Sequence, residues 1–176
     1  DVERSRGLGD VYKRQAQLEA SKAFAKEVMA AAGVPTAGSR VCTTAAEAAA
    51  ALDEFGAPHV VKDDGLAAGK GVVVTSDRAE ALAHAEACFA AGGTVVIEDF
   101  LDGPEVSLFV ICDGEDAVAL TPAQDFKRIH DGDAGPNTGG MGAYTPLPWL
   151  PEGFTDEVMD RVARPVLAEN ARRCLL

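Results

Sequence analysis

The stretch VVKDDGLAAGKGVVV, residues 60–74, decides the fold, because it joins two short apolar runs through a loop of small residues. The runs 58–62 and 71–75 have the length and the β-branched content of buried strands. The Gly and Ala residues between them are typical of a tight connection rather than of a helix. The stretch therefore predicts two strands linked by a glycine-rich flap.

The flap between these strands has the composition of a polyphosphate-binding loop. Gly65, Gly69 and Gly71 can adopt positive φ and let backbone N–H groups approach an anion closely. Lys62 and Lys70 supply ammonium groups in an otherwise acidic chain. The spacing fits neither Walker A, which feeds a helix, nor the G-x-G-x-x-G fingerprint. The competing interpretation is an ordinary glycine turn with solvated lysines.

A third apolar run ends in acidic residues at VIEDFLDGPEVS, residues 96–107. Glu98 closes this run, where a solvated charge is unexpected, and Glu105 starts the next predicted strand. Phe100 and Leu101 between them offer apolar surface. An adenine needs apolar faces and a few hydrogen bonds at its edge, whereas a ribose diol suits a carboxylate acceptor. We therefore expect a nucleotide hinge here, with two surface acids beside a Gly-Pro turn as the alternative.

The most glycine-rich segment is QDFKRIHDGDAGPNTGGMGAY, residues 124–144. We expect residues 131–144 to form a long loop, which is seldom an inert connector because ordering it costs entropy. Backbone amides at 138–140 are suited to a phosphate. Lys127 and Arg128 are suited to bind a charged substrate. Asp125, Asp131 and Asp133 are suited to bind an amine or a metal-bound nucleotide. The alternative is a flexible linker between two lobes.

Helices and strands alternate through the rest of the chain, which predicts an α+β or mixed α/β domain. A capping box, Thr44-x-x-Glu47, predicts a helix that runs to Phe55. Pro165 is expected to kink or interrupt the last helix. The further expected helices span 18–32, 77–91 and 155–172, and the further expected strands span 39–42, 94–98, 105–112 and 116–120.

Composition and charge exclude several classes of protein. The chain has 176 residues with 16 basic and 28 acidic side chains, a net charge of −12, and 47% hydrophobic residues. Such acidity argues against binding to nucleic acid or to an anionic membrane surface. No apolar run approaches the roughly 18 residues of a membrane span. The scattered cysteines, Cys42, Cys88, Cys112 and Cys174, fit neither a zinc site nor a disulfide framework, so we expect reduced thiols and a cytoplasmic location.

The two ends of the chain differ from its body. Residues 1–15 are charged and lack helical or strand periodicity, and residues 173–176 stop abruptly after the last predicted helix. Both ends resemble translated cloning or adaptor sequence, so we expect a non-native or disordered leader at 1–15 and a non-native end at 173–176. The alternative is an ordinary disordered terminus.

Taken in order, the flap, hinge and glycine-rich segments resemble the phosphoribosylamine–glycine ligases, also called glycinamide ribonucleotide synthetases, of the ATP-grasp superfamily. The resemblance covers roughly residues 16–170, and GPNTGGMGAY at 135–144 is highly specific for these ligases. It implies an ATP-grasp fold. The implied parts are a helical linker with the start of the ATP-grasp region at 16–58, a nucleotide lid subdomain with flap and hinge at 59–122, and the start of a larger lobe with the glycine-rich substrate loop at 123–172.

The resemblance also implies a role for each matched position. The expected nucleotide-binding residues are Lys62, Gly65, Gly69, Lys70, Gly71, Glu98, Asp99, Phe100, Leu101 and Glu105. The expected catalytic residues, facing phosphoribosylamine and the acyl phosphate, are Asp125, Lys127 and Arg128. The expected substrate-binding residues are Pro136, Asn137, Thr138, Gly139, Gly140, Met141 and Gly142. No metal ligand is expected within the chain, because the family's Glu and Asn ligands belong to a later segment.

The reaction implied by the resemblance converts ATP, 5-phosphoribosylamine and glycine into ADP, phosphate and glycinamide ribonucleotide through a glycyl phosphate, with Mg²⁺ or Mn²⁺ bridging the ATP phosphates. These small molecules are the expected partners, without nucleic acid or membrane, and a monomer is expected. The family's N-terminal substrate domain and its metal-binding segment are not matched, so we expect an internal fragment with weak or no activity alone. Two alternatives stay open: another ATP-grasp carboxylate–amine ligase, and a non-catalytic nucleotide-binding module.

Overall fold

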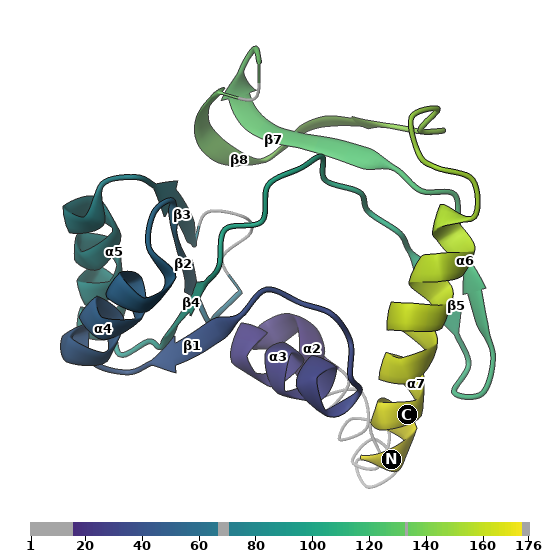
Figure 1. Cartoon of the computed structure of the whole chain (residues 1–176), viewed down its shortest axis with the longest axis horizontal. Helices are drawn as coiled ribbons and strands as arrows, with labels where there is room; N and C mark the ends of the chain where they lie inside the picture. Colours follow the sequence, from purple (N-terminus) through teal and green to yellow (C-terminus); the bar gives the residue numbers. More distant parts are fainter. Residues whose placement is uncertain (1–15, 67–70, 133, 174–176) are drawn as a thin grey trace, which may run out of the picture.

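The computed structural model of the protein describes residues 16–66, 71–132 and 134–173. A four-stranded sheet with two covering helices forms one side of the molecule, and two β hairpins with the C-terminal helices form the other (Figure 1). The short helices α2 (Gln17–Ala20) and α3 (Lys22–Ala31) lie between these two sides. This mixture of helices and antiparallel strands confirms the expected α+β class.

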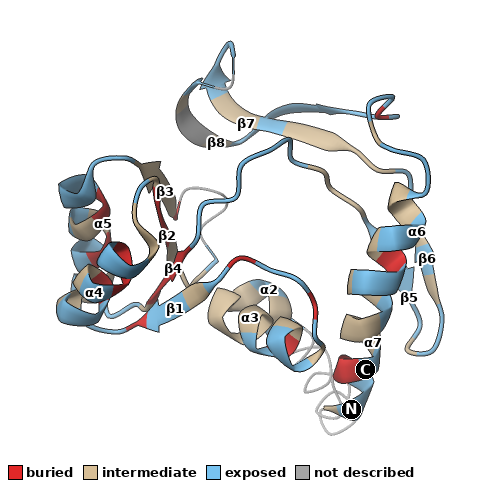
Figure 2. Ribbon diagram, viewed as in Figure 1, coloured by how far each residue is buried: buried red, intermediate tan, exposed pale blue. Residues whose placement is uncertain are grey.

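The four-stranded sheet is antiparallel throughout, with the strand order β1-β4-β2-β3. Helices α4 and α5 pack on one of its faces, and the buried residues concentrate between them and the strands (Figure 2). The layer begins at Ser39, before residue 59, where the sequence places the start of the lid. Its bounds are β1 (Ser39–Cys42), α4 (Ala45–Phe55), β2 (His59–Asp63), β3 (Val72–Thr75), α5 (Arg78–Ala90) and β4 (Val95–Glu98).

Alternation along the strands sorts their side chains between the two faces of this sheet. Val61, Val95 and Ile97 are fully buried against the helices. The intervening residues, Lys62 and Glu98 among them, line the opposite face. One face of the sheet thus completes an apolar core, and part of the other face, including Lys62 and Glu98, lines a cleft.

Two caps that the sequence predicts define where α4 and α5 begin. Thr44 accepts the backbone N–H of Glu47, and the Glu47 carboxylate accepts the backbone N–H of Thr44, which confirms the capping box. Asp77 accepts the backbone N–H groups of Ala79 and Glu80 at the start of α5. These caps satisfy amides of the first helical turn that have no partner within the helix.

The single helix expected over residues 18–32 is wrong in one respect, because Ser21 separates α2 from α3. Ser21 is extended, with φ −132° and ψ 115°, and its hydroxyl accepts the backbone N–H of Phe24. A serine competes for backbone hydrogen bonds, so it favours a new N-cap over continuation of the helix. Helix α3 therefore begins at Lys22, next to the end of β2.

The glycine-rich segment forms a strand, which corrects the loop expected over residues 131–144. β7 (Gln124–His130) and β8 (Ala134–Tyr144) make an antiparallel hairpin with register irregularities between Phe126 and His130. Glycine and proline are poor strand formers, so sequence preference favours a loop here. Pairing with β7 outweighs that preference, because it gives backbone groups of β8 hydrogen-bonding partners.

The second hairpin is shorter than the strands expected over 105–112 and 116–120. β5 (Val110–Cys112) and β6 (Ala117–Ala119) flank the predicted turn at 113–114, and an isolated bridge joins Ser107 to Ala123. The register places alternate residues of both strands on one face. That face exposes four large apolar side chains, Phe109, Ile111, Val118 and Leu120.

The helix expected over 155–172 has three parts. α6 (Phe154–Val158) passes through a π-helical turn (Met159–Ala163) into α7 (Arg164–Arg172). Pro165 has no N–H to donate within a helix, so a wider turn just before it accommodates the missing bond. The interruption lies where the sequence predicts one.

The end of α7 is fastened to α3 by a cluster of charged side chains. Arg173 pairs with Glu27 at 2.8 Å, lies over the Phe24 ring at 5.9 Å, and pairs with Glu169 at 2.6 Å. Hydrogen bonds from Arg172 and Arg173 lower the pKa of Glu169 to about 2. The cluster therefore joins two helices that are far apart in the sequence.

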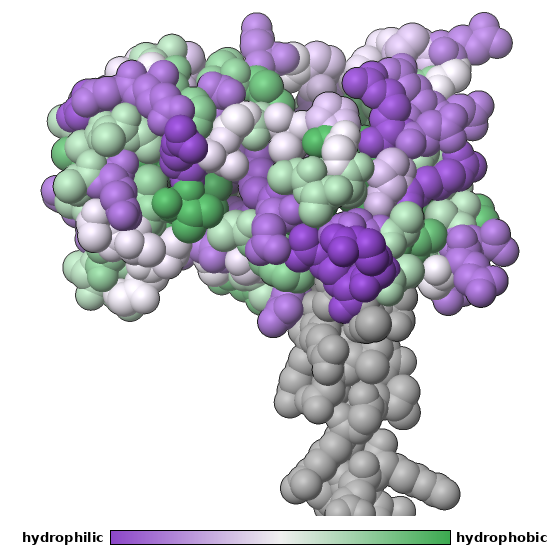
Figure 3. Space-filling view, turned by 60° about the horizontal axis from the view of Figure 1, so that its bottom comes forward, coloured by the Kyte–Doolittle hydropathy of each residue, from purple (hydrophilic) through white to green (hydrophobic). Residues whose placement is uncertain are grey.

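The described helices are short, and α5, with 13 residues, is the longest of them. In the part of the chain that the structure describes, no helix is both long and apolar enough to cross a membrane. Hydrophilic side chains spread over the face seen in Figure 3, with apolar patches between them. Among the described cysteines, Cys42 is buried, Cys88 is half-buried, Cys112 is exposed, and none forms a disulfide.

Candidate functional site

A cleft of about 1170 Å³ lies between the open face of the four-stranded sheet and the β7–β8 hairpin. The sheet contributes Val60, Lys62 and Glu98, the connection after β4 contributes residues 99–105, and β7 contributes residues 124–130. The cleft thus gathers the predicted hinge and the predicted catalytic segment into one site. Strands β2 and β3, which flank the predicted flap, form part of its wall.

A buried carboxylate with two lysine partners lies at the inner wall of the cleft. Glu98 is 5% exposed and pairs with the Lys62 Nζ at 2.7 Å and with the Lys26 Nζ at 3.3 Å. Lys62 reaches Glu98 across the β2–β4 pair, where the two residues are diagonal neighbours on one face. This trio of Lys26, Lys62 and Glu98 carries more positive than negative charge.

Lys26 supports the site through its pair with Glu98, and sequence reasoning missed it. It lies on α3, and its Nζ also donates to the Ala37 carbonyl at 2.9 Å and to Thr36 Oγ1 at 2.7 Å. Within a helix a lysine is ordinarily a solvated residue, so its type and position gave no signal. Lys22 was missed for the same reason, and its Nζ donates to the carbonyls of Asp63 and Gly65 at 2.6 and 2.9 Å.

The hinge after β4 exposes apolar side chains to the cleft, whereas the carboxylate of one acid in the hinge is hydrogen-bonded to the backbone. Phe100 and Leu101 line the cleft and are 43% and 69% exposed, so their faces are available to a flat ring. Asp99 also lines the cleft, but its carboxylate accepts the backbone N–H of Gly38 at 3.0 Å, and its own N–H donates to the Gly38 carbonyl. Asp99 therefore anchors the hinge to the chain before β1.

Opposite the hinge, a lysine on β7 connects two predicted subsites. The Lys127 Nζ bonds to the Asp125 carboxylate and lies 3.8 Å from Glu105 Oε1. The hydrogen bond to Asp125 raises the pKa of Lys127, so the ammonium stays charged. Glu105 is largely exposed within the cleft, and Arg128 donates from Nη1 to the Gly135 carbonyl at 2.7 Å.

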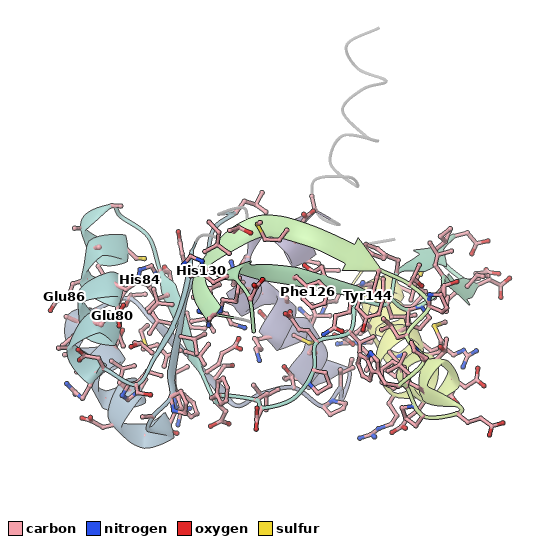
Figure 4. The ribbon with its side chains drawn as sticks, turned by 90° about the horizontal axis from the view of Figure 1, so that it is seen from above. Glu80, His84, Glu86, Phe126, His130 and Tyr144 are labelled. Atoms are coloured by element: carbon pink, nitrogen blue, oxygen red, sulfur yellow. The ribbon has the colours of Figure 1, made fainter. Side chains whose placement is uncertain are left out.

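The β7 wall is stiffened by aromatic contacts. Phe126 lines the cleft and stacks on Tyr144, with ring centroids 5.8 Å apart (Figure 4). The Tyr144 hydroxyl donates to Gln124 Oε1 and accepts from Trp149 Nε1, both at 2.9 Å. His130 lies on the same strand as Phe126, toward the tip of the hairpin, and also lines the cleft.

The predicted substrate-binding residues on β8 are brought to the hairpin, but their described contacts are mainly internal. Thr138 Oγ1 donates to the Lys127 carbonyl at 2.9 Å and accepts the Gly140 N–H at 3.1 Å. Met141 lines the cleft and is 58% exposed. Gly139 and Gly142 lie on the same strand.

Some predicted residues have a different or an undescribed environment. Gly65 and Gly71 flank the flap, where the Gly71 carbonyl accepts the Asp63 N–H at 2.7 Å. Gly69 and Lys70 lie outside the described residues, as do the side chains of Pro136 and Asn137. Within the described ranges, no group of three or more His, Cys, Asp or Glu residues could hold a metal ion.

Comparison with known proteins places this geometry in a family. Residues 20–174 match the family model described as phosphoribosylglycinamide synthetase, ATP-grasp (A) domain. The chain is 64% identical to a phosphoribosylamine–glycine ligase of Leifsonia xyli over 156 residues, and 65% identical to one of Streptomyces coelicolor over 158 residues. These matches cover 89% and 90% of this chain but 37% of each relative. The chain thus spans little more than a third of the length of these relatives.

Solved structures show the same arrangement of elements. A crystal structure of phosphoribosylamine–glycine ligase from Thermotoga maritima superimposes with a TM-score of 0.83 at 35% identity, over 92% of this chain and 42% of that one. D-alanyl-alanine synthetase A from Vibrio cholerae, 13% identical over 89% of this chain and 49% of that one, shares the fold with a TM-score of 0.69. The expected ATP-grasp fold is confirmed. The family model matches nearly the whole length of the chain, and the predicted hinge and the β7–β8 hairpin line one cleft. The chain therefore belongs to the phosphoribosylglycinamide synthetase ATP-grasp (A) domain family.

Proposed function

We propose that the cleft binds ATP as part of a phosphoribosylamine–glycine ligase. The trio of Lys26, Lys62 and Glu98 carries this proposal, because it fixes the ammonium group of Lys62 in the same cleft as the apolar hinge residues Phe100 and Leu101. A nucleotide needs these two kinds of surface next to each other. A small inorganic anion would not contact the apolar residues of the cleft.

Each part of ATP has a matching part of the cleft. The adenine ring would lie against Phe100 and Leu101, and the ribose hydroxyls would donate to the exposed carboxylate of Glu105. The phosphates would lie toward Lys62 and the flap between β2 and β3. ATP-grasp ligases work with ATP and a divalent metal, and we propose that Mg²⁺ or Mn²⁺ enters with the nucleotide phosphates.

The reaction we propose joins glycine to 5-phosphoribosylamine. ATP phosphorylates the glycine carboxylate, and the amine of phosphoribosylamine then displaces phosphate from the glycyl phosphate, giving glycinamide ribonucleotide, ADP and phosphate. Lys127 and Arg128 would neutralise the charge of the acyl phosphate, and Asp125 would hold Lys127 in place. The names and the high identity of the matched relatives support this choice of substrates. The cytoplasmic location and the monomeric state stay predictions.

Equilibrium binding of ATP to the 176-residue chain and to Lys62→Ala tests the nucleotide site. We expect Lys62→Ala to weaken ATP binding by about 1–3 kcal/mol, the scale of a charge-assisted contact. Arg78→Ala is the matched control, because it removes an exposed ion pair with Asp53 on the far side of the sheet. Equal ATP affinity in all three proteins would remove the phosphate role of Lys62.

Substrate dependence of ADP release tests the reaction. We expect release only when glycine and phosphoribosylamine are both present, at a low rate, since the relatives that carry this name are much longer. Release that requires a different carboxylate or amine would instead favour another ATP-grasp ligase. Tight ATP binding without release under any of these conditions would favour a nucleotide-binding module.

A further inference from the structure

Helix α3 is fastened to the start of the flap by one carboxylate. Asp64 follows β2 directly, and its Oδ1 accepts the backbone N–H of Ala23 at 2.7 Å. Its Oδ2 accepts the Ser21 hydroxyl at 3.0 Å. A carboxylate that accepts from the first turn of a helix also interacts favourably with the helix dipole. We call the contacts of Ser21 and Ala23 with Asp64 the Asp64 clasp.

The base of the clasp is held by backbone hydrogen bonds. The Asp64 N–H donates to the Thr94 carbonyl at 2.9 Å, just before β4, and the Asp63 N–H donates to the Gly71 carbonyl at 2.7 Å across the flap. Gly65, the first glycine of the flap, donates its N–H to Asp63 Oδ1 at 3.1 Å. Asp64 therefore has a fixed place relative to both β4 and the flap.

The helix that the clasp holds carries two lysines that support the wall of the cleft from α3. Lys22 and Lys26 are four residues apart, so they lie on the same side of α3. Lys22 donates to the carbonyls of Asp63 and Gly65, and Lys26 pairs with Glu98. A shift of the α3 N-terminus away from Asp64 would move both ammonium groups relative to the flap and the hinge.

We infer that Asp64 is a positioning residue, which makes α3 and the flap entrance one unit and so sets where Lys26 holds the cleft residue Glu98 and where Lys22 holds the start of the flap. This inference rests on the proposed nucleotide site. Asp64 need not touch the ligand, because it acts through the helix. It differs in this from Asp77, which caps α5 on the covered face of the sheet and has no contact with a described cleft residue.

The experiment compares Asp64→Ala with Asp77→Ala, since each variant removes one aspartate cap. Two quantities are measured on the 176-residue chain: the dissociation constant of ADP, and amide hydrogen exchange at Ala23 and Gly65. For Asp64→Ala we expect a rise of about 3- to 30-fold in the ADP dissociation constant, the range of coupling through packed elements. We also expect faster exchange at both amides. Asp77→Ala should lower the melting temperature without either change.

A second variant keeps the test decisive if Asp64→Ala does not fold. Asp64→Asn retains an oxygen that can accept the Ala23 N–H but loses the charge. Its ADP affinity should therefore lie below that of the unsubstituted chain and above that of Asp64→Ala. Equal ADP affinity in Asp64→Asn and the unsubstituted chain, with unchanged exchange at Gly65, would overturn the inference. If the unsubstituted chain fails to bind ADP, the nucleotide proposal falls, whereas exchange at Gly65 still decides the clasp.

Discussion

At the scale of single residues, the site depends on how one buried acid is compensated. Glu98 would be costly to bury without a partner, because the loss of hydration of a carboxylate amounts to several kcal/mol. The two ammonium groups of Lys26 and Lys62 therefore compensate the buried carboxylate and leave the trio with a small positive excess. The strand supplies Lys62 and Glu98, and α3 supplies Lys26 from a different part of the chain.

Lys26→Met should destabilise the fold, because Glu98 then keeps only Lys62 as an ammonium partner. We expect a loss of about 1–3 kcal/mol in the free energy of unfolding, measured by urea denaturation. Arg40→Met is the control, since its pair with Glu54 is exposed on both sides and such pairs contribute at most about 1 kcal/mol. Equal losses in the two variants would contradict the role of Lys26.

The sequence predicts two members of this trio, Lys62 and Glu98, and misses the third, Lys26, for a physical reason. A period of two along a strand fixes the face on which Lys62 and Glu98 lie, so their proximity follows from strand pairing. Lys26 meets them through the packing of α3 against the sheet, and no local pattern encodes that contact. Hydrogen bonds of Asp64 to α3 were missed in the same way, because they join residues more than 40 positions apart.

At the scale of elements, β8 shows how a partner strand overrides composition. The helix caps and the turn are local chemistry, so the sequence predicts α4, α5 and the β5–β6 turn well. The strand identity of 134–144 depends instead on β7, to which it is hydrogen-bonded. Its glycines reflect backbone conformation, since Gly140 and Gly142 have φ of 128° and 151°, where other residues are strained.

Gly140→Ala should weaken the β7–β8 hairpin. Its φ of 128° lies in a region that only glycine adopts readily, and we expect a loss of about 1–3 kcal/mol in the stability of the hairpin. Amide hydrogen exchange along β7 measures this loss. Gly139→Ala is the matched control, because an added Cβ meets nothing within 4 Å and φ is not positive there. Equal effects of the two variants would contradict a conformational role for Gly140.

At the scale of the whole molecule, α3 connects the two sides of the fold. The Asp64 clasp and Lys26 join it to the four-stranded layer, and Arg173 joins it to α7 through Glu27 and Phe24. The second connection is made of charged side chains, so it depends on pH. Glu169 is the carboxylate at its centre.

Acid should therefore loosen α7 from α3. The pKa of Glu169 is about 2 in the folded chain, below its ordinary value of 4.5, so the unfolded chain binds more protons between these pH values. The contribution of Glu169 to stability is complete above about pH 4.5 and is lost as the pH falls toward 2. Urea midpoints at pH 7, 4 and 3 should fall less steeply in Glu169→Gln than in the unsubstituted chain. Equal decreases of the urea midpoint in the two proteins would contradict this role of Glu169.

The trio of Lys26, Lys62 and Glu98 has a kinetic consequence for any polyanion that approaches the chain. The protein as a whole carries a net charge of −12, whereas the trio carries a small positive excess. Repulsion therefore acts at long range and attraction only near contact. At physiological ionic strength the Debye length is about 8 Å, so salt suppresses the repulsion more than the attraction. We therefore expect added salt to speed the first encounter with a polyanion.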